Sequence, residues 1–508
     1  MFGWREPGKP QPMRLLPAAV LTGARRLSAL DGSFLRLESA DAHMHVGWSA
    51  VFTVPEGQPR PTLAALCDRV ARRLDDLEWC RWRLQRAPLG LSEPRWVRDD
   101  HFDISKHVRA LSQFDETVGY DRLAGMRDAL LSRPLDHSRP PWEIYLVPRL
   151  EDGRMALLGK VHHSLVDGIA ALQIVGLIID EPDGDSSADD LARARNRIST
   201  TRQQDPVDWA IDEFKHAARA GLGALHATAA AAIRPQAALR IVIRDCGRVA
   251  AAARADLLSR APGSPLNASI GQRRTLVGYR AKRDLLRDAR AARGGTLNDI
   301  GLTVVAGALR ELAARRGEIP TEPLKAMVPV SMRAPGEDGP GNQISMVYIQ
   351  LPVQLATPIE RLEAVRAEMQ ELKDSGRAEG TETMYAIGSL LPAPLRSPMV
   401  KALASPRVFN LTISQSPGPR GDVRVLGCEM DEVFSVVPIS EQHALAIGMV
   451  RYRRELFIGC YADPVALPEA SDLPALLDAE LHALAEQGSR AGGGRAGGGV
   501  PVTGRQTV

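Results

Sequence analysis

The stretch VHHSLVDG, residues 161–168, places two histidines and an aspartate in a polar turn. It follows the apolar run MALLGKV at 155–161, which is typical of a buried strand, and precedes IAALQIV at 169–175, which has helical periodicity. The end of a buried strand can hold an imidazole rigidly and aim it into a cleft. The stretch therefore predicts an α/β fold with both histidines mounted at a strand end.

Among these residues, His163 is the candidate catalytic base. Histidine titrates close to neutral pH, so a neutral imidazole can remove a proton from a hydroxyl as that hydroxyl attacks a carbonyl. A base of this kind contributes about 100- to 10,000-fold in rate. We expect His162 to support the base. We expect Asp167 to brace the loop, by pairing with an arginine or capping the next helix, because it is too close along the turning chain to be assumed a catalytic partner.

Two other interpretations of these histidines are open. In the first they are ordinary strand-end residues followed by an Asp-Gly turn, and in the second they bind a metal ion. Adjacent residues on a strand point to opposite faces, whereas the histidines of zinc sites usually stand three to five residues apart. His43 and His45 would share a strand face, but no cluster of cysteines or carboxylates accompanies them. We therefore expect no metal site, and the strand–turn–helix context favours catalysis.

The motif HHSLVDG at 162–168 resembles the HHxxxDG signature of the CoA-dependent acyltransferases, which include chloramphenicol acetyltransferase, carnitine acyltransferases and condensation domains. Within this superfamily the chain most resembles the bacterial wax ester synthase/diacylglycerol acyltransferase family, from about Leu27 to Gln487. The segments that carry this likeness are 27–35, 44–47, 134–143, 295–300, 328–333 and 409–419.

Two positions depart from the family pattern. Pro141 stands where the family usually reads Pro-Leu-Trp, and Gln415-Ser416 follow Ser414 where relatives usually have an asparagine. Asn298, in the segment that resembles the family's Asn-Asp motif, has two interpretations: the cap of the helix that follows, or an amide that holds the oxyanion or supports the base. A donor aimed at a developing oxyanion is worth about 3–4 kcal/mol.

The resemblance implies two chloramphenicol-acetyltransferase-like α/β domains that face one another around a central channel and are joined by a helical linker. It also implies transfer of a long-chain fatty acyl group from acyl-CoA to the hydroxyl of diacylglycerol or of a long-chain alcohol. His163 would deprotonate the acceptor, and no covalent intermediate or resident cofactor is expected, since acyl-CoA is a co-substrate. No serine stands in the Gly-x-Ser-x-Gly elbow of a hydrolase.

Two alternative functions remain open. The first is an acyltransferase or condensation enzyme that takes its acyl group from a carrier protein or from CoA and transfers it to another alcohol, since the histidine motif is shared with such enzymes. A catalytically weak homologue that binds lipid is the second alternative. Activity with free acyl-CoA would argue against a carrier-protein user, and turnover would argue against a binding protein.

Composition and charge narrow the class of protein further. The 508 residues, 44% of them hydrophobic, are enough for two large domains. The net charge of +3, with acids and bases interspersed, lacks the basic footprint of nucleic-acid binding. Five scattered cysteines indicate reduced thiols in the cytoplasm. There is no secretory signal and no apolar run of about 20 residues that would span a membrane.

The chain divides into five predicted segments. These are a flexible lead at 1–26, a first domain with the motif at 27–182, a loop and helical connector at 183–263, a second domain at 264–487, and a disordered Gly/Arg tail at 488–508. The connector contains LRIVIR at 239–244, which can lie at the inner membrane or a lipid-droplet surface. The favoured alternative is that its helices buttress the two domains.

Overall fold

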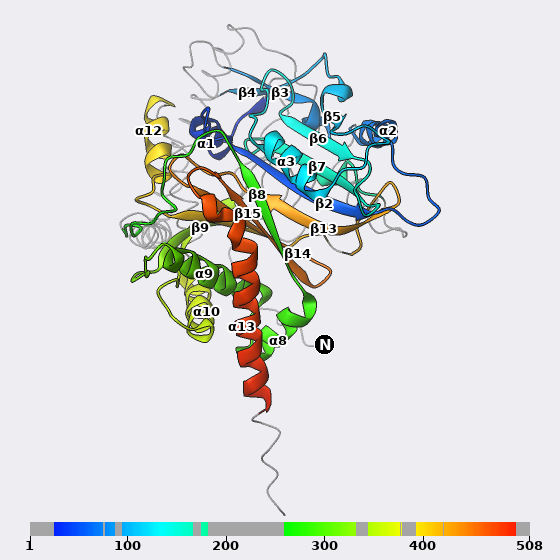
Figure 1. Cartoon of the computed structure of the whole chain (residues 1–508). Coiled ribbons are helices and arrows are strands. Elements are labelled where there is room, and N and C mark those ends of the chain that lie inside the picture. Colours follow the sequence, from blue (N-terminus) through cyan, green and yellow to red (C-terminus); the bar gives the residue numbers. More distant parts are fainter. Residues whose placement is uncertain are drawn as a thin grey trace, which may run out of the picture.

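The computed structural model describes residues 25–74, 77–86, 94–165, 174–180, 259–331, 344–375, 377, 393–419 and 421–493. They form two six-stranded sheets, a small three-stranded sheet and the helices that cover them (Figure 1). This is a mixed α/β fold, as the sequence predicts. Residues 183–258 of the predicted connector at 183–263 lie outside the described residues.

The N-terminal sheet contains the predicted motif strand near its middle. Its strand order is β12-β13-β2-β7-β6-β5. The strands that the first half of the chain supplies are β2 (His45–Thr53), β5 (Val108–Ala110), β6 (Trp142–Val147) and β7 (Met155–His162). All eight residues of β7 are buried, because β7 has a paired neighbour on each edge and packing on both faces, which agrees with its unbroken apolar sequence.

Helices and a small sheet surround this N-terminal sheet. The helices are α1 (Ala29–Leu37), α2 (Leu63–Arg73) and α3 (Tyr120–Leu131), with short 3-10 turns η1 (Glu78–Arg81) and η3 (Ile104–Lys106). The small sheet is made of β1 (Arg25–Arg26), β4 (Arg95–Arg98) and β3 (Trp82–Gln85). The pairing of β1 with β4 places the last residues of the predicted flexible lead in a strand.

The C-terminal sheet has the order β10-β9-β11-β14-β15-β8. Its strands are β8 (Thr275–Ala281), β9 (Leu324–Ser331), β10 (Ile344–Leu351), β11 (Leu411–Ser416), β14 (Leu445–Tyr452) and β15 (Glu455–Ala462). The apolar runs at 324–328, 444–450 and 456–463 form most of β9, β14 and β15. Both faces of β14 and β15 are buried, because helices cover one face of the sheet and β13 lies against the other.

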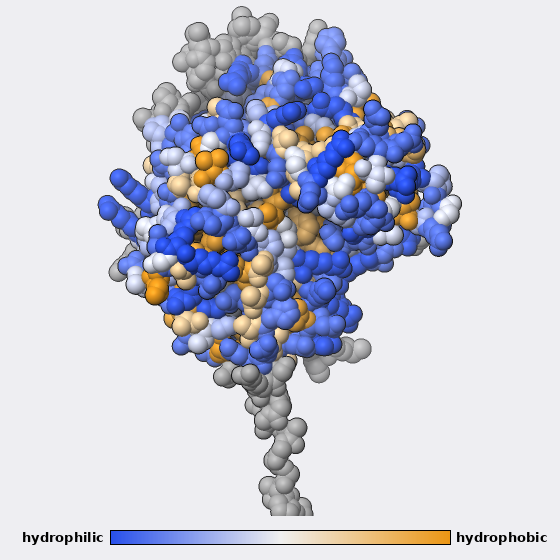
Figure 2. Space-filling view, in the orientation of Figure 1, coloured by the Kyte–Doolittle hydropathy of each residue, from blue (hydrophilic) through white to orange (hydrophobic). Residues whose placement is uncertain are grey.

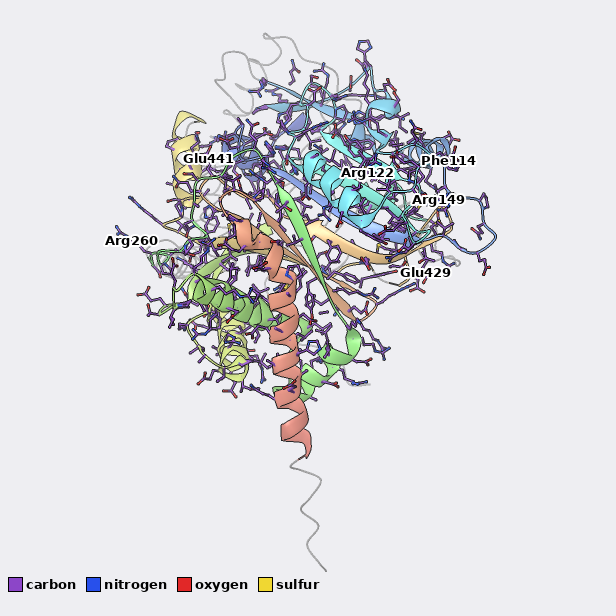
Figure 3. The ribbon with its side chains drawn as sticks, in the orientation of Figure 1. Phe114, Arg122, Arg149, Arg260, Glu429 and Glu441 are labelled. Carbon is purple, nitrogen blue, oxygen red and sulfur yellow. The ribbon has the colours of Figure 1, made fainter. Side chains whose placement is uncertain are left out.

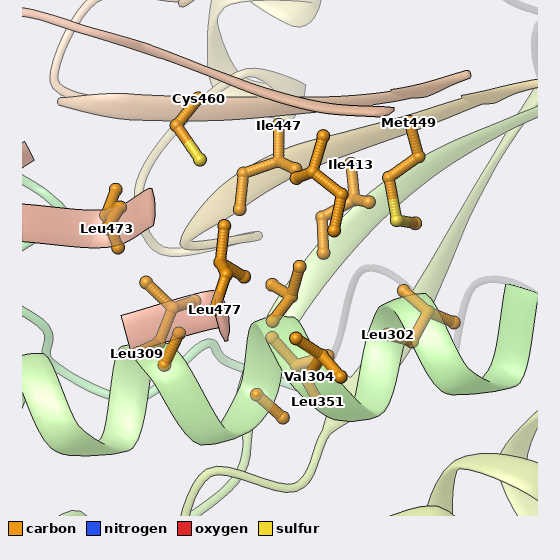
Figure 4. Packing of buried hydrophobic residues seen from close by; sticks show 14 of the residues in the cluster. Leu302, Val304, Leu309, Leu351, Ile413, Ile447, Met449, Cys460, Leu473 and Leu477 are labelled. Atoms are coloured by element: carbon orange, nitrogen blue, oxygen red, sulfur yellow. The ribbon is translucent and has the colours of Figure 1, made fainter. Parts of the chain in front are cut away.

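Four of the described helices cover one face of the C-terminal sheet: α8 (Arg283–Arg293), α9 (Leu297–Arg315), α10 (Pro358–Ser375) and α13 (Leu473–Gly493), with the 3-10 turn η5 (Pro468–Asp472) before α13. The helix α12 (Ala393–Leu403) instead packs beside α1 (Figure 1). Side chains of α9 such as Leu302 and Leu309 pack against Ile447 and Met449 of the sheet (Figure 4). The helix α13 reaches Gly493 and so continues six residues into the segment predicted as a disordered tail, although three of those six residues are glycines, which disfavour helix.

One pair of strands crosses from the second half of the chain to the first sheet. The strands β12 (Arg424–Val425) and β13 (Cys428–Val436) follow β11 in the chain, yet β13 pairs antiparallel with β2. The chain then returns to the C-terminal sheet as β14. Residues 424–436 lie within the predicted second domain, and the structure adds them to the first sheet, because β2 would otherwise have an unpaired edge.

The strand β13 lies directly against the C-terminal sheet at three glycines. A Cβ at Gly278 would lie 2.7 Å from the ring of Phe434, and a Cβ at Gly448 would overlap Ser435. Gly459 approaches the Ser435 carbonyl in the same way. These glycines let the two sheets come closer than side chains would allow.

No helix within the described ranges is both long and apolar enough to cross a membrane. The face shown in Figure 2 is mostly hydrophilic, with apolar residues in small scattered groups.

The first prediction concerns the contact between β13 and Gly448. Gly448→Ala is expected to lower the free energy of unfolding by about 1–3 kcal/mol, because the added methyl group meets the Ser435 side chain and lies 2.9 Å from its carbonyl oxygen. Urea unfolding followed by circular dichroism measures the change. Gly125→Ala in the exposed middle of α3 is the control; nothing lies near its Cβ, so it should be neutral or stabilising. Equal effects of the two substitutions would contradict the prediction.

Candidate functional site

The histidine turn lies where the sequence predicts it, at the end of a buried strand. His162 is the last residue of β7 and pairs with His45, the first residue of β2. The His163 N–H donates to the Met44 carbonyl (2.8 Å), and the Leu165 N–H donates to the His162 carbonyl (3.0 Å). These backbone bonds fix both histidines to the sheet. Asp167, the predicted brace, lies outside the described residues.

His163 is partly exposed, and its ring stacks on Phe34. The two ring centroids are 3.8 Å apart and the rings are inclined by 10°. Phe34 belongs to α1, which begins with a capping box: Ser28 and Asp31 each accept a hydrogen bond from the other's backbone N–H. The helix start is therefore fixed, and with it the aromatic face that orients His163.

His162, in contrast, is almost completely buried. Its Nδ1 accepts a hydrogen bond from the Ser164 backbone N–H (3.1 Å) and lies 2.6 Å from the Ser164 hydroxyl. A nitrogen that accepts from an N–H carries no proton of its own, so the neutral ring holds its proton on Nε2. That Nε2 lies 3.5 Å from a carboxylate oxygen of Glu38. Burial lowers the pKa of His162, while Glu38 acts in the opposite direction.

Glu38 lies between two imidazoles. Its second carboxylate oxygen is 3.3 Å from Nε2 of His137. Burial alone would raise the pKa of Glu38, but its interactions with His137 and His162 outweigh burial and lower this pKa to about 2. Glu38 is therefore an ionised group behind the histidine motif. Sequence reasoning did not find this role, because no short-range pattern links positions 38, 137 and 162.

These three residues are also the one group within the described chain whose ligand atoms converge as a metal site would require. Two histidines and a carboxylate are a donor set that zinc or iron takes. The His162 tautomer opposes this use, because its Nε2 carries the proton and presents no lone pair. The geometry favours a hydrogen-bonded network that orients His162.

His43 and His45 occupy different environments. Only His45 belongs to β2; His43 precedes the strand, and its Nε2 lies 2.9 Å from the Ala40 carbonyl oxygen. The prediction that both are strand residues is thus wrong for His43. Burial, and then the charge of Lys160, lower the pKa of His45 well below its usual range. The hydroxyl of Tyr461, from β15, lies 3.4 Å from His45 Nε2 and connects the two halves of the molecule.

Asn298 is the second residue of α9, and it is not the cap of that helix. Thr296 is the cap: its hydroxyl accepts from the Asp299 N–H (3.2 Å), and the Asp299 carboxylate accepts from the Thr296 N–H (2.7 Å). The expected capping role thus belongs to Thr296 and Asp299, which together satisfy two backbone donors.

The position of α9 separates Asn298 from the histidine turn. One turn after Asn298, a Cβ at Gly301 would lie 2.7 Å from the sulfur of Met449. Side chains alternate along a strand, and Tyr461, which contacts His45, belongs to the opposite face of the sheet from the core under α9. The strands β14 and β15 therefore lie between α9 and the site. The role of Asn298 as an oxyanion donor stays a prediction.

Both positions that depart from the family pattern lie within the described residues, so their contacts can be given. The Pro141 carbonyl accepts the His162 N–H (2.9 Å), so this proline directly supports the motif strand. Gln415 pairs with Met449 through the backbone of β11, and its side-chain nitrogen has no hydrogen-bond partner within the described residues. The Ser416 hydroxyl accepts from the Gly418 N–H (3.3 Å) and closes the following turn.

Comparisons with known proteins agree with this fold. Residues 27–301 match the catalytic domain of the wax ester synthase/diacylglycerol acyltransferase family, and residues 340–485 match its C-terminal domain. Two Mycobacterium tuberculosis proteins named as diacylglycerol O-acyltransferases are similar in sequence. One is 29% identical over 454 residues, covering 88% of this chain and 93% of that protein; the other is 30% identical over 470 residues, covering 90% of each.

Solved structures share the whole fold. A wax ester synthase/diacylglycerol acyltransferase from Marinobacter aquaeolei matches 92% of this chain and all of its own, with a TM-score of 0.63 and 24% identity. The first condensation domain of the calcium-dependent antibiotic synthetase matches 93% of this chain and 97% of its own, with a TM-score of 0.56 and 16% identity.

The fold and the histidine turn therefore define a two-domain acyltransferase of the chloramphenicol-acetyltransferase-like class. Within that class, the chain belongs to the wax ester synthase/diacylglycerol acyltransferase family. The resemblance drawn from the sequence is confirmed.

The second prediction concerns Glu38. Glu38→Gln is expected to lower the free energy of unfolding at pH 7 by about 1–3 kcal/mol, because it removes the charge that faces the buried imidazole of His162 and the partly buried imidazole of His137. The folded-state pKa lies below the ordinary value of 4.5, so the contribution of Glu38 is complete above about pH 4.5 and is lost as the pH falls toward 2. Urea unfolding at pH 7 and pH 3.5 measures it.

Exposed Glu56 supplies the matched control. Glu56→Gln should leave stability within about 0.5 kcal/mol of the wild type at both pH values. A difference between wild type and Glu38→Gln that stays the same, or grows, at the lower pH would contradict the assignment of Glu38 as the ionised partner of the two imidazoles.

Proposed function

We propose that this acyltransferase moves a long-chain fatty acyl group from acyl-CoA to the hydroxyl of diacylglycerol, of a long-chain alcohol, or of both. The names of its mycobacterial relatives support diacylglycerol, and the name of the Marinobacter protein includes both acceptors. Acyl-CoA is a co-substrate in this proposal, with no resident cofactor. The observation that carries it is the partly exposed His163 on a fixed strand end, within a matched catalytic domain.

In the proposed reaction, His163 is the general base. Its neutral imidazole removes the proton of the acceptor hydroxyl while the oxygen attacks the thioester carbonyl. The tetrahedral intermediate collapses, the carbon–sulfur bond breaks, and the CoA sulfur leaves with the proton that His163 returns. Holding both substrates beside one base converts a bimolecular encounter into a positioned reaction.

Phe34 and Glu38 have separate parts in this proposal. The stack on Phe34 limits the rotation of the His163 ring, so that a nitrogen stays directed toward the substrates. Glu38 acts through His162, whose position sets the backbone of the turn. Both are positioning residues, since neither is proposed to exchange a proton with substrate.

We further propose a cytoplasmic enzyme that meets its lipid acceptor at the surface of the inner membrane or of a lipid droplet. The acceptors are poorly soluble in water, so an enzyme in the aqueous phase must collect them from such a surface. The connector segment at 239–244, which the sequence offers for this contact, lies outside the described residues.

The third prediction tests the base. Palmitoyl-CoA is incubated with dioleoylglycerol or hexadecanol, and both thiol release and ester product are followed. His163→Ala is expected to lower the rate of acyl transfer about 100-fold or more and to leave the unfolding transition unchanged. The rates of the wild type with the two acceptors rank them.

His101→Ala is the control, because His101 is an exposed histidine on a turn of the N-terminal half and should be fully active. Substantial ester synthesis by His163→Ala would refute the assignment of the base. Absence of ester from the wild type with both acceptors would favour a carrier-linked donor or a lipid-binding role instead.

A further inference from the structure

A cavity of about 370 Å³ lies at the C-terminal end of α9. Figure 1 shows α9 extending from beside α8 toward the left of the view, where this end lies. The walls are the end of α9, the segment at 262–266, the loop at 318–322 and the first residue of β9. Most of the lining residues are apolar, and the volume falls within the range of small-molecule sites in proteins.

This cavity is separate from the histidine turn. Its lining residues Leu309 and Leu467 belong to the core between the C-terminal sheet and its helices. Tyr461, which contacts His45, lies on the opposite face of that sheet. The sheet therefore stands between the cavity and His163, so a ligand bound in the cavity is not in position to react.

The wall that follows α9 is fixed by a Schellman turn. The Gly317 N–H donates to the Ala314 carbonyl (2.9 Å). The Glu318 N–H donates to the Ala313 carbonyl (3.0 Å), which completes the turn. Gly317 supplies the positive φ of 78° that such a turn requires. The loop at 318–322 therefore leaves the helix in one defined direction.

The opposite wall, at 262–266, is bound to the sheet. The Asn410 side chain donates to the Pro262 carbonyl (2.8 Å). The Ala444 N–H donates to the Leu266 carbonyl (2.8 Å). Since both walls are held by the protein itself, the cavity is preorganised and suits a discrete ligand.

An exposed isoleucine stands at the rim of the cavity. Among the described residues, the exposed large apolar side chains are Ile319 (72%), Val465 (67%) and Phe114 (46%). Ile319 lines the cavity, and Val465 is two residues before the lining residue Leu467. Phe114 lies across the view from Arg260, which precedes the cavity wall at 262–266 (Figure 3). The rim therefore offers apolar area that an apolar ligand would remove from water.

The charges at the rim select the head group of the ligand. Arg316 donates two hydrogen bonds to Glu469 (3.0 and 2.5 Å), so its charge is already neutralised. Glu318 and Glu322 line the cavity, are exposed and form no ion pair within the described residues. Two carboxylates repel a fatty acid or an anionic phospholipid, and they accept hydrogen bonds from a hydroxyl group.

The volume limits the number of hydrocarbon chains. At about 30 Å³ for a group the size of a water molecule, the cavity holds roughly twelve methylene groups. This is enough for most of one long chain. A lipid with two or three chains would leave the others in water.

From these observations we infer that the cavity binds a single-chain lipid with an uncharged hydroxyl head group, such as a long-chain alcohol or a monoacylglycerol. The chain enters the cavity and covers Ile319, and the hydroxyl group donates to Glu318 or Glu322. Because this accessory site lies across the sheet from His163, it holds the lipid without presenting it to the base. The inference is independent of the proposed function, since binding here needs no acyl-CoA.

The fourth prediction maps the cavity with a photoreactive lipid. A dodecanol analogue with a diazirine near the end of its chain is irradiated with the wild type in the absence of acyl-CoA. Mass spectrometry of the digested protein is expected to find labels on the lining segments 262–266 and 309–324. Excess dodecanol or monolauroylglycerol should remove these labels, and the more effective competitor identifies the preferred head group.

A pair of adjacent alanines on α9 gives a matched test of the position. Ala313→Phe is expected to lower the labelling about tenfold or more, because Ala313 lines the cavity and the added ring fills it. Ala314→Phe is the control, since Ala314 is exposed and does not line the cavity. It should be labelled like the wild type. His163→Ala should also keep these labels.

The exposed loop supplies a second variant that does not alter the core. Ile319→Ser is expected to lower the labelling about threefold or more, because the chain loses its cover at the rim. Phe114→Ser is the matched control, since it changes another exposed apolar side chain in the other half of the molecule. It should leave the labelling unchanged.

Competition by lipids of equal chain length tests the head group. In the wild type, laurate is expected to compete about tenfold less well than dodecanol, because Glu318 and Glu322 repel its carboxylate. Glu318→Gln/Glu322→Gln should reduce this difference to about twofold or less. Glu56→Gln/Glu371→Gln removes two exposed charges outside the cavity and should preserve the tenfold difference.

Several results would overturn the inference. Labels confined to the histidine turn would show that the alcohol binds only at the reaction site. Full labelling of both Ala313→Phe and Ile319→Ser, or equal losses in their controls, would remove the cavity as the site. Equal competition by laurate and dodecanol would contradict the head group. A wild type that labels the cavity and makes no ester would contradict the proposed function alone, and ester synthesis without cavity labels would contradict this inference alone.

Discussion

The close contact between β13 and the glycines of the C-terminal sheet sets the geometry of the whole molecule. β13 pairs with β2 in one sheet while its Phe434 and Ser435 lie against Gly278 and Gly448 of the other. Because β2 also pairs with the motif strand β7, the same strand fixes how the histidine turn meets β15. Larger side chains at those glycines would push the sheets apart and carry His45 away from Tyr461. The position of the histidine turn relative to β15 thus depends on the backbone packing of β13.

Buried charges complete the connection between the two halves. Arg274 and Asp463, both about 1% exposed, lie 3.5 Å apart, and Arg274 also donates to the carbonyl of Asp41 in the first half. On the neighbouring helix α3, Asp128 accepts from the Thr275 hydroxyl (2.7 Å) and thereby ties α3 to β8. Buried ion pairs add little net stability because desolvation offsets their attraction, but breaking one is costly. Their effect is to make one relative placement of the halves much more favourable than others.

Local sequence predicted the parts of this structure that depend on local chemistry. The apolar run before His162 predicts the buried strand β7 and the position of the histidines at its end, because a strand buried on both faces needs an unbroken apolar sequence. The interpretation of Asn298 as the helix cap begins α9 two residues too late, because the cap is Thr296 and its capping-box partner is Asp299. The pairing of β13 with β2 and the role of Glu38 depend on residues more than 100 positions apart, and no periodicity in a single sequence encodes such contacts.

The doublet of histidines follows from the alternation of side chains at a strand end. If one imidazole points into the core, its neighbour must point away from it, so a single short motif supplies a buried ring and an accessible ring. The buried ring of His162 is bound on both sides, by the Ser164 N–H and by the Glu38 carboxylate, and so it fixes the backbone of the turn. The accessible ring of His163 keeps contact with solvent and is oriented by Phe34. In the proposed reaction the base needs both rigidity and access to substrate, and the two histidines divide these requirements: His162 fixes the turn and His163 reaches the solvent.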